Sequence, residues 1–122
     1  MNKNPAKDKS YLFALKIIQL YQYLAKEQQE YVLSKQLLKS ATSIGANVEE
    51  ALGGQSRKDF LAKISIAYKE CRETNYWLRL LRDSKIIPEE KAIQFLSDSD
   101  ELIRIIGSIK RTTQNNKKIL NS

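Results

Sequence analysis

The chain of 122 residues contains no histidine. Histidine is the commonest general base and the commonest metal ligand, so its absence removes every Ser-His and Cys-His nucleophile pair. It also removes the Glu-x-x-His pairs on which a ferritin-like di-iron site depends. The one glycine pair, Gly53-Gly54, belongs to no phosphate-binding loop of the Walker type. We therefore predict that the protein is not an enzyme and that it carries no cofactor and no metal.

Cysteine, proline and long apolar runs are also scarce. The single cysteine, Cys71, cannot form an intramolecular disulfide, and its place in an apolar stripe predicts a small buried side chain. No apolar run reaches the roughly 18 residues that span a bilayer. The first ten residues lack the apolar segment of a secretion signal. These absences favour a cytoplasmic protein without membrane contact.

The composition is that of an ordinary folded domain with an excess of positive charge. Apolar residues make up 42% and charged residues 29%, and only four glycines and two prolines interrupt the chain, so long helices are possible almost throughout. The formal net charge is +7, from 21 Lys and Arg against 14 Asp and Glu. Such an excess favours polyanionic partners, nucleic acid first. The alternative is that the charge only keeps the protein in solution.

The apolar residues recur with the period of a helix. In the clearest stripe they alternate in steps of four and three, at Phe60, Ile64, Ala67, Cys71, Thr74, Leu78 and Leu81. We predict helices at residues 10–26, 31–52, 57–84 and 88–113, between a loose tail at 1–9 and a basic tail at 114–122 that frays after Thr113. No segment alternates with period two, so strands are not expected. The predicted fold is all-α, a single domain built as an up-down-up-down antiparallel four-helix bundle.

Residues with capping chemistry mark several helix limits. Asp8 or Ser10 can cap the first helix, and Ser56 can cap the third. The Gly53-Gly54 pair should end the second helix, because glycine readily adopts the left-handed conformation of many C-terminal caps.

The second helix contains a run of small side chains from Ser40 to Ala46. Gly45 within it costs about 1 kcal/mol relative to alanine, so the close approach of a neighbouring backbone is the expected compensation. The residues expected to face inward on this helix are Leu33, Leu37, Ala41, Ile44, Val48 and Leu52. Those expected on the fourth helix are Phe95, Leu102, Ile106 and Ile109.

The first helix carries more apolar surface than one bundle needs. Its apolar residues between Tyr11 and Ala25 occupy an arc of about 220°, whereas a helix on the outside of a monomeric bundle needs an arc only somewhat wider than about 100°. We predict two contacts for this helix, one inside its own bundle and one against another subunit. The alternative is that the surplus residues are tolerated at a surface.

Two sets of polar residues are candidates for function. As phosphate-binding residues we take Lys58, Lys63, Arg79, Arg82, Lys110, Arg111, Lys117 and Lys118. The second set borders the apolar stripes, where half-buried carboxylates need positive or hydrogen-bonding partners. Its members are Asn47, Glu50, Arg57, Glu70, Arg72 and Glu73. We interpret this second set as an interhelical network that fixes register; a ligand or nucleic-acid site is the alternative.

The middle of the chain carries a series of short motifs. They are Asn47-Val48-Glu49-Glu50-Ala51, Gly54-Gln55-Ser56, Asp59-Phe60, Ile66-Ala67 and Arg72-Glu73-Thr74. This series resembles the central pattern of the small four-helix-bundle proteins encoded by intervening sequences inside bacterial 23S ribosomal RNA genes. That pattern reads approximately Asn-Ile-Ala-Glu-Gly, a short Gly/Arg/Ser linker, Glu-Phe, Ile-Ala and Glu-x-Glu-Thr. The motifs cover residues 37–82, and the four-helix plan extends the resemblance over most of the chain.

The chain departs from this pattern at two positions. Ala51 stands where the family usually has glycine, and Glu49 where it usually has alanine. Both fall at the end of the second helix, so we expect its cap to be shifted toward Gly53-Gly54.

The resemblance implies a homopentamer of antiparallel bundles, which agrees with the wide apolar arc of the first helix. Its relatives include accessory proteins of reverse transcriptases in diversity-generating retroelements, basic pentamers thought to contact nucleic acid and the polymerase. Five copies of this chain would carry a formal charge of +35, that is 5 × 7. The resemblance implies no defined function for the ribosomal-RNA branch.

Two functional hypotheses follow. The first is a non-enzymatic oligomer that binds RNA or another nucleic acid through its basic side chains. The second is a structural or protein-interaction module, for example a partner of a reverse-transcriptase-like polymerase, whose charge serves solubility only.

Overall fold

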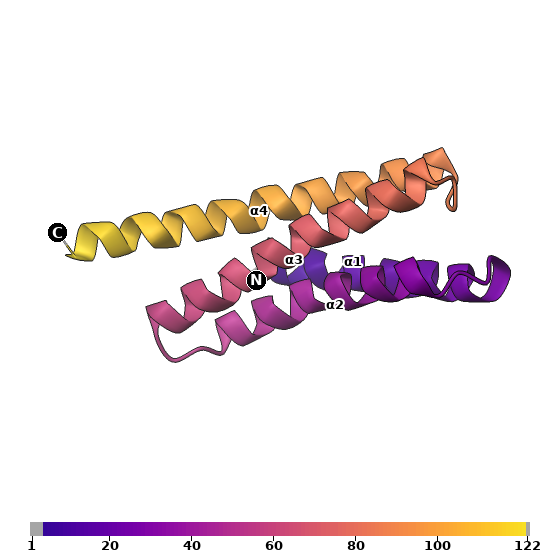
Figure 1. Cartoon of the computed structure of the whole chain (residues 1–122). Coiled ribbons are helices and arrows are strands. Elements are labelled where there is room, and N and C mark those ends of the chain that lie inside the picture. Colours follow the sequence, from indigo (N-terminus) through magenta and orange to yellow (C-terminus); the bar gives the residue numbers. More distant parts are fainter. Residues whose placement is uncertain (1–3, 122) are drawn as a thin grey trace.

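Four helices account for nearly all of the chain. The structure, a computed structural model, describes the backbone of residues 4–121 and the side chains of residues 4–116. The helices are α1 (Pro5–Glu27), α2 (Val32–Leu52), α3 (Arg57–Asp83) and α4 (Glu89–Asn121), joined by short connections (Figure 1). The described residues contain no strand. Helix α2 packs against α1 and α3, and α3 against α4, while α1 and α4 touch more sparsely. The all-α four-helix bundle expected from the sequence is confirmed.

The core is formed by the apolar stripes of the four helices. On α3, the predicted stripe is buried from Ile64 to Leu81, and only its first member, Phe60, is half-buried. On α4, Leu102 and Ile106 are buried, with Phe95 and Ile109 half-buried against them. These stripes keep one side of each helix against its partners over several turns, as a bundle requires.

One predicted core residue at the end of α2 lies outside. Leu52 is 46% exposed, and Ala51 is buried in its place at 2% exposure. Ala51 and Leu52 are three and four residues after Val48, so they lie on either side of the apolar stripe that contains Val48. Periodicity alone therefore cannot decide which of the two side chains faces inward. The prediction for Leu52 is therefore wrong.

Helix α1 begins earlier than the sequence indicated. We expected a loose tail over residues 1–9, yet α1 starts at Pro5. The side chain of Asn4 accepts a hydrogen bond of 3.1 Å from the backbone N–H of Lys7, which caps the helix, and proline is well suited to the first helical turn. Neither Asp8 nor Ser10 is the N-cap. Residues 1–3 of the expected tail lie outside the described residues.

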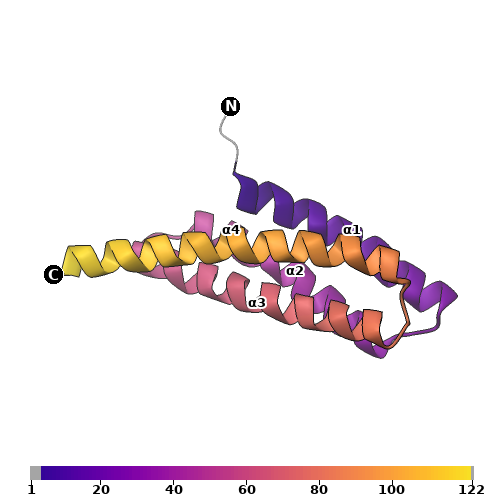
Figure 2. The ribbon, with the colours of Figure 1, turned by 90° about the horizontal axis from the view of Figure 1, so that it is seen from above.

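Helix α4 continues past the expected fraying point. We expected the helix to end near Thr113, but it extends to Asn121. No glycine or proline occurs between residues 108 and 121 to stop it. Figures 1 and 2 both show the last turns of α4 projecting beyond the connection between α2 and α3.

The glycine pair ends α2 for a different reason than expected. Gly53 is the C-cap, but its φ is −90°, outside the left-handed region. A Cβ on Gly54 would lie 3.2 Å from the carbonyl oxygen of Ala51, closer than nearly all real Cβ contacts. Close approach of the backbone, and not a left-handed conformation, explains the glycine at position 54. At the start of α3, the Ser56 hydroxyl accepts from the N–H of Asp59 at 3.0 Å, as predicted.

The N-terminus of α2 is capped by a carboxylate. The side chain of Glu30 accepts hydrogen bonds from the backbone N–H groups of Val32, Leu33 and Ser34, at 3.0, 2.8 and 2.8 Å. Burial by itself would raise the pKa of Glu30, but these hydrogen bonds, with help from the Ser34 hydroxyl, outweigh it and lower that pKa. The ionised form therefore stabilises the fold.

We expect Glu30→Ala to lower the free energy of unfolding at pH 7 by about 1 kcal/mol, the usual cost of a lost cap. Because the pKa of Glu30 is lowered on folding, its contribution is complete above the ordinary glutamate value of 4.5 and disappears as the pH falls through the lower folded value. Urea unfolding at pH 7 and pH 3 should thus show a difference between wild type and variant that shrinks in acid. Glu27→Ala, at an exposed position in the last turn of α1, is the control. An equal loss in both variants would contradict the capping role.

Candidate nucleic-acid interface

The excess positive charge is concentrated in the second half of the chain. Residues 57–122 contain 14 Lys and Arg against 9 Asp and Glu, whereas residues 1–56 contain 7 against 5. All six arginines fall in the second half, which forms α3 and α4. A surface for a polyanion is therefore to be sought on these two helices.

An open groove of about 450 Å³ runs between α3 and α4. Arg79 and Arg82 line it from α3, and Arg104 lines it from α4, with Ile93 and Leu96 among its apolar residues. We call this the arginine groove. Its three guanidinium groups come from two antiparallel helices, so they are brought together only by the fold.

An asparagine in the groove joins α3 to α4 by hydrogen bonds. Asn75 Nδ2 donates to Ser99 Oγ at 3.2 Å and to Asp100 Oδ1 at 3.1 Å, across the α3–α4 contact. Arg79 Nε donates to Asn75 Oδ1 at 2.9 Å, and its guanidinium lies 5.8 Å from the centre of the Tyr76 ring. These contacts leave the terminal nitrogens of Arg79 without a partner among the described residues, while its Nε is fixed.

Arg82 is engaged differently. Its Nε donates to Asp83 Oδ1 at 2.8 Å, and the two side chains form an ion pair on the surface. This hydrogen bond raises the pKa of Arg82 and lowers the pKa of Asp83. Part of the charge of Arg82 is thus neutralised locally, so Arg79 and Arg104 are the stronger candidates for phosphate contact.

A second basic cluster lies further along the same two helices. The ring of Tyr68 has Lys110 Nζ 5.1 Å and Arg72 Cζ 5.9 Å from its centre. Gly107 makes room for the ring, because a Cβ there would lie 2.9 Å from Tyr68 Cε1, and 3.5 Å from a terminal nitrogen of Arg111. We call these residues the tyrosine cluster. Cation–π contacts of this kind hold the charges in place without neutralising them.

The structure brings together four of the eight predicted phosphate-binding residues. Arg79 and Arg82 lie in the arginine groove, and Lys110 and Arg111 in the tyrosine cluster. Lys63 lies elsewhere, paired with Glu50 of α2 at 3.5 Å. The remaining three are Lys58, exposed at the start of α3, and Lys117 and Lys118, whose side chains lie outside the described residues.

Sequence reasoning missed several residues of this surface. Asn75, Asp100 and Arg104 line the groove, and Tyr68 and Tyr76 contact basic side chains of this surface, yet none of them was among the candidates. A signal existed, because positions 68, 72, 75, 79 and 82 follow one another in steps of three and four and therefore share one face of α3. Residues 93, 97, 100, 104, 107 and 111 do the same on α4. What the sequence does not give is the register that places these two faces side by side.

The predicted polar network does not form as one unit. Asn47 Nδ2 donates to the carbonyl of Ser43 within α2, at 2.8 Å. Glu73 accepts from Trp77 Nε1 at 3.3 Å within α3. Arg72 stacks on Tyr68 instead of meeting a carboxylate. Most of these polar side chains contact partners on their own helix. The proposed contacts between helices are therefore largely missing.

The other members of that set are also separate. Glu50 reaches α3 through Lys63 alone, and Arg57 is exposed at the start of α3. Burial, together with the neighbouring charge of Glu73, raises the pKa of Glu70, against the opposing effect of Lys69 and Lys39. No positive side chain is within ion-pair distance of Glu70 in the described part of the chain.

The buried polar link between α2 and α3 is made by two hydroxyls. Ser40 and Thr74, 1% and 0% exposed, form a hydrogen bond of 2.9 Å across the helix contact. Next to Thr74 along the same stripe, Cys71 is fully buried, and burial, with the charge of Glu70, raises the pKa of its thiol to about 12. A thiol that stays protonated at neutral pH is a poor nucleophile, so Cys71 acts as a small apolar residue, as predicted.

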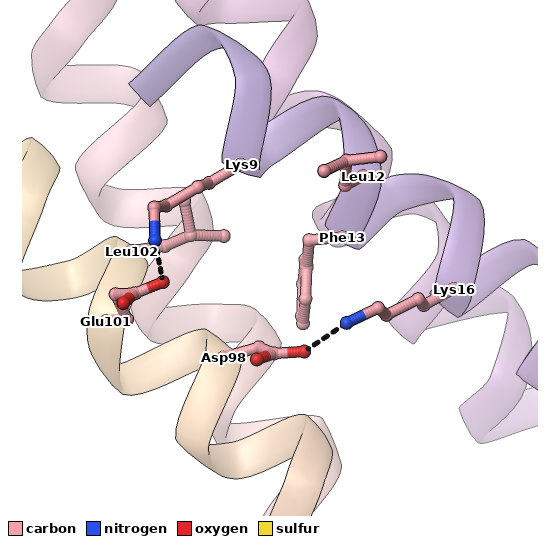
Figure 3. A pocket seen from close by; sticks show the side chains of 7 residues that line it. All are labelled: Lys9, Leu12, Phe13, Lys16, Asp98, Glu101 and Leu102. Carbon is pink, nitrogen blue, oxygen red and sulfur yellow. Dashed lines mark hydrogen bonds and ion pairs between the residues drawn. The ribbon is translucent and has the colours of Figure 1, made fainter. Parts of the chain in front are cut away.

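A smaller pocket of about 210 Å³ separates α1 from α4 (Figure 3). Lys9 Nζ lies 2.9 Å from Glu101 Oε1, and Lys16 Nζ lies 3.2 Å from Asp98 Oδ2. Figure 3 shows these two ion pairs bridging the helices beside Phe13. Because every charged group of the pocket already has a partner, we assign it a structural role in joining the sparsely packed α1 and α4.

The outward side of α1 is apolar. Tyr11, Leu15 and Ile18 are 63%, 43% and 37% exposed and lie on the side of the helix opposite the buried Phe13 and Ile17. We call these three residues the outer α1 face. Contiguous apolar surface of this kind on a folded protein is typical of an interaction site.

Neither a metal site nor a membrane span is evident in the described residues. No group of three or more Cys, Asp and Glu side chains among them is placed to hold a metal ion. No helix in this part of the chain has the length and apolarity needed to cross a bilayer.

These observations define a class: a four-helix bundle that is basic on α3 and α4 and apolar on the outside of α1. Residues 2–108 match the family described as 23S rRNA-intervening sequence protein, and the chain belongs to this family. A crystal structure from Bacteroides thetaiotaomicron VPI-5482 is 48% identical, with a TM-score of 0.85 over 87% of this chain and 95% of that one. It is described as a protein with unknown function from the S23 ribosomal protein family. A search of curated proteins finds no match.

Proposed function

We propose that the protein is a non-catalytic, self-associating RNA-binding protein of the cytoplasm. The observation that carries this proposal is the line of arginines on the outer side of α3 and α4. Within the described residues, Arg72, Arg79, Arg104 and Arg111 form no ion pair with a carboxylate. Their charges are available to an external anion, and arginine can bind phosphate through two parallel hydrogen bonds.

Binding of this kind depends on the phosphate backbone. Lys and Arg that neutralise phosphates release counterions, so affinity falls steeply as salt rises, with little dependence on sequence. RNA is favoured because guanidinium planes and aromatic rings that stack on bases serve unpaired RNA well, and the tyrosine cluster and Tyr76 offer both. DNA is the competing polyanion.

Self-association is the second part of the proposal. The outer α1 face is an apolar surface that remains exposed after the bundle is packed, and a second copy of the chain is its proposed partner. Next to it, a hollow of about 560 Å³ is lined by Lys7, Asp8 and Glu49 as well as Tyr11, so both signs of charge are present for pairing between copies. A homopentamer would concentrate five basic surfaces in one particle and strengthen binding through avidity.

A protein-interaction module is the second candidate function. The outer α1 face favours it, because the same apolar surface could bind a different protein, such as a reverse-transcriptase-like polymerase. In that case the positive charge would serve solubility, and nucleic acid would bind only weakly.

A salt titration separates the two functions. After light scattering has established the molar mass of the particle, binding is measured to an RNA hairpin and to a matched DNA duplex over increasing salt. With five phosphate contacts per chain, log K should fall against log salt with a slope of about −4. Tighter binding of the RNA would establish the substrate class. A well-formed oligomer that binds neither nucleic acid at low salt would contradict the proposal and favour the protein-interaction function.

A further inference from the structure

We infer that the arginine groove holds one single strand of RNA, with phosphates on its arginines and a base edge at Asp100. The inference rests on the proposed RNA binding and goes further by stating which form of RNA binds and where. It follows from the shape of the groove, from the position of its one unpaired acidic oxygen, and from the exposed ring beside it.

The shape of the arginine groove favours a single strand of RNA over a duplex. The groove is a furrow between two neighbouring helices, whose axes in packed pairs are 8–10 Å apart. A furrow of that width admits one strand, whereas a duplex can rest only on its rims. From Asn75 to Arg82 the α3 wall of the groove extends about 10 Å, at 1.5 Å per residue. That length matches about three stacked nucleotides at 3.4 Å each.

The arginine groove contains side chains of both charges. Arg79 and Arg104 lie on opposite walls, and Asp100 lies near them on α4. Asp100 Oδ1 accepts from Asn75, while no hydrogen bond or ion pair engages Oδ2 among the described residues. A carboxylate repels phosphate but accepts a hydrogen bond from an exocyclic amino group, as in contacts to cytosine N4. The backbone therefore lies on the arginines, and a base that carries an amino group lies at Asp100.

Tyr76 provides a stacking surface at the edge of the groove. Its side chain is 47% exposed, with the Arg79 guanidinium 5.8 Å from the ring centre and the Trp77 ring packed edge-on at 5.2 Å. These neighbours hold the ring in place before RNA arrives. Bases of single strands stack on such rings and on guanidinium planes, whereas bases inside a duplex cannot.

The test compares C6 and U6 RNA with a blunt-ended RNA duplex, measured by fluorescence anisotropy at several salt concentrations. C6 should bind more tightly than U6, because uracil has no exocyclic amino group. C6 should also compete with a longer unpaired RNA for the same site. The double variant Arg79→Gln/Arg104→Gln should make the salt slope shallower by about 1.4, corresponding to two phosphate contacts. Asp100→Asn should reduce the preference for C6 over U6 and leave the slope unchanged.

The matched control removes two charges elsewhere. Lys26→Gln/Lys35→Gln changes two exposed lysines on α1 and α2 and should leave the slope within error of wild type. Arg104→Gln alone changes a side chain that forms no hydrogen bond or ion pair within the described residues, so it tests the groove even if the double variant folds poorly. Circular dichroism and light scattering verify each variant.

The outcomes distinguish this inference from the proposed function. If the RNA duplex binds but C6 and U6 neither bind nor compete, the single-strand inference is wrong and RNA binding stands. If the groove variants behave like the lysine control, the site lies elsewhere on the molecule. If no RNA binds at low salt, the proposed function itself fails. Equal binding of C6 and U6 by wild type would overturn the role of Asp100.

Discussion

Leu15→Lys combined with Ile18→Lys is expected to reduce the particle in solution to a single chain of 14.1 kDa. Both side chains belong to the outer α1 face, at 43% and 37% exposure, and neither contributes to the buried core of its own bundle. A lysine there costs the monomer little, because its ammonium group reaches water. In an interface between copies, the same charge would be buried without a partner and would cost several kcal/mol. Each 1.4 kcal/mol is a tenfold loss of affinity, so association should weaken by at least a thousandfold.

Light scattering and unfolding measurements together check this result. The variant should lose its higher molar mass while its helical signal by circular dichroism persists. Val32→Lys combined with Gln36→Lys adds the same charge at two exposed positions of α2 and should leave the mass unchanged. If the double variant of α1 keeps the mass of wild type, the subunits meet through another surface.

The proposed subunit interface and the proposed RNA surface are separate in this structure. The outer α1 face and the arginine groove lie on different helices, so the monomeric variant retains its groove. We attribute any loss of RNA affinity in that variant to lost avidity, since each chain keeps its own +7 charge apart from the added lysines. Binding by the monomer should therefore be weaker and yet retain the preference for C6.

The bundle was predictable because its signals are local. The spacing of apolar residues on α3 identified six of its buried positions, and the helix-terminating chemistry of Gly53-Gly54 and Ser56 marked the turn before it. Where two adjacent residues compete for one inward position, periodicity fails, as it did for Leu52 and Ala51. The start of α1 was missed because Asn4 lies among polar residues that carry no apolar period, and only its cap contact reveals the helix.

The site was predictable only in part because it depends on contacts between helices. Basic residues on one helix can be read from the sequence, but the pairing of Asn75 with Asp100 depends on the register of α3 against α4. The prediction of a polar network between helices was wrong because local contacts within one helix replaced it. Arg72 had a nearby aromatic partner in Tyr68, one turn away, and local partners of this kind satisfy a polar side chain before distant ones do.

The small residue at position 45 is expected to be essential to the contact between α1 and α2. A Cβ on Gly45 would lie 3.3 Å from Ser10 Oγ, which is tighter than nine in ten real Cβ contacts, and 3.7 Å from the Ser10 carbonyl carbon, which is an ordinary van der Waals distance. Ser10 is itself fully buried, so it has no free space into which to move. This close approach is the compensation expected for a glycine inside a helix.

Gly45→Leu is therefore expected to lower the free energy of unfolding by about 1–3 kcal/mol, measured by urea denaturation. The added side chain must enter the space of α1, and relief requires α1 to move away from α2. Ala46→Leu is the matched control: it places the same side chain one residue further along the same helix, where the native side chain is exposed. Leucine is a good helix former, so this control should change the stability by no more than about 0.5 kcal/mol. Equal stability of the two variants would mean that α1 and α2 are further apart at Ser10 than their close contact implies.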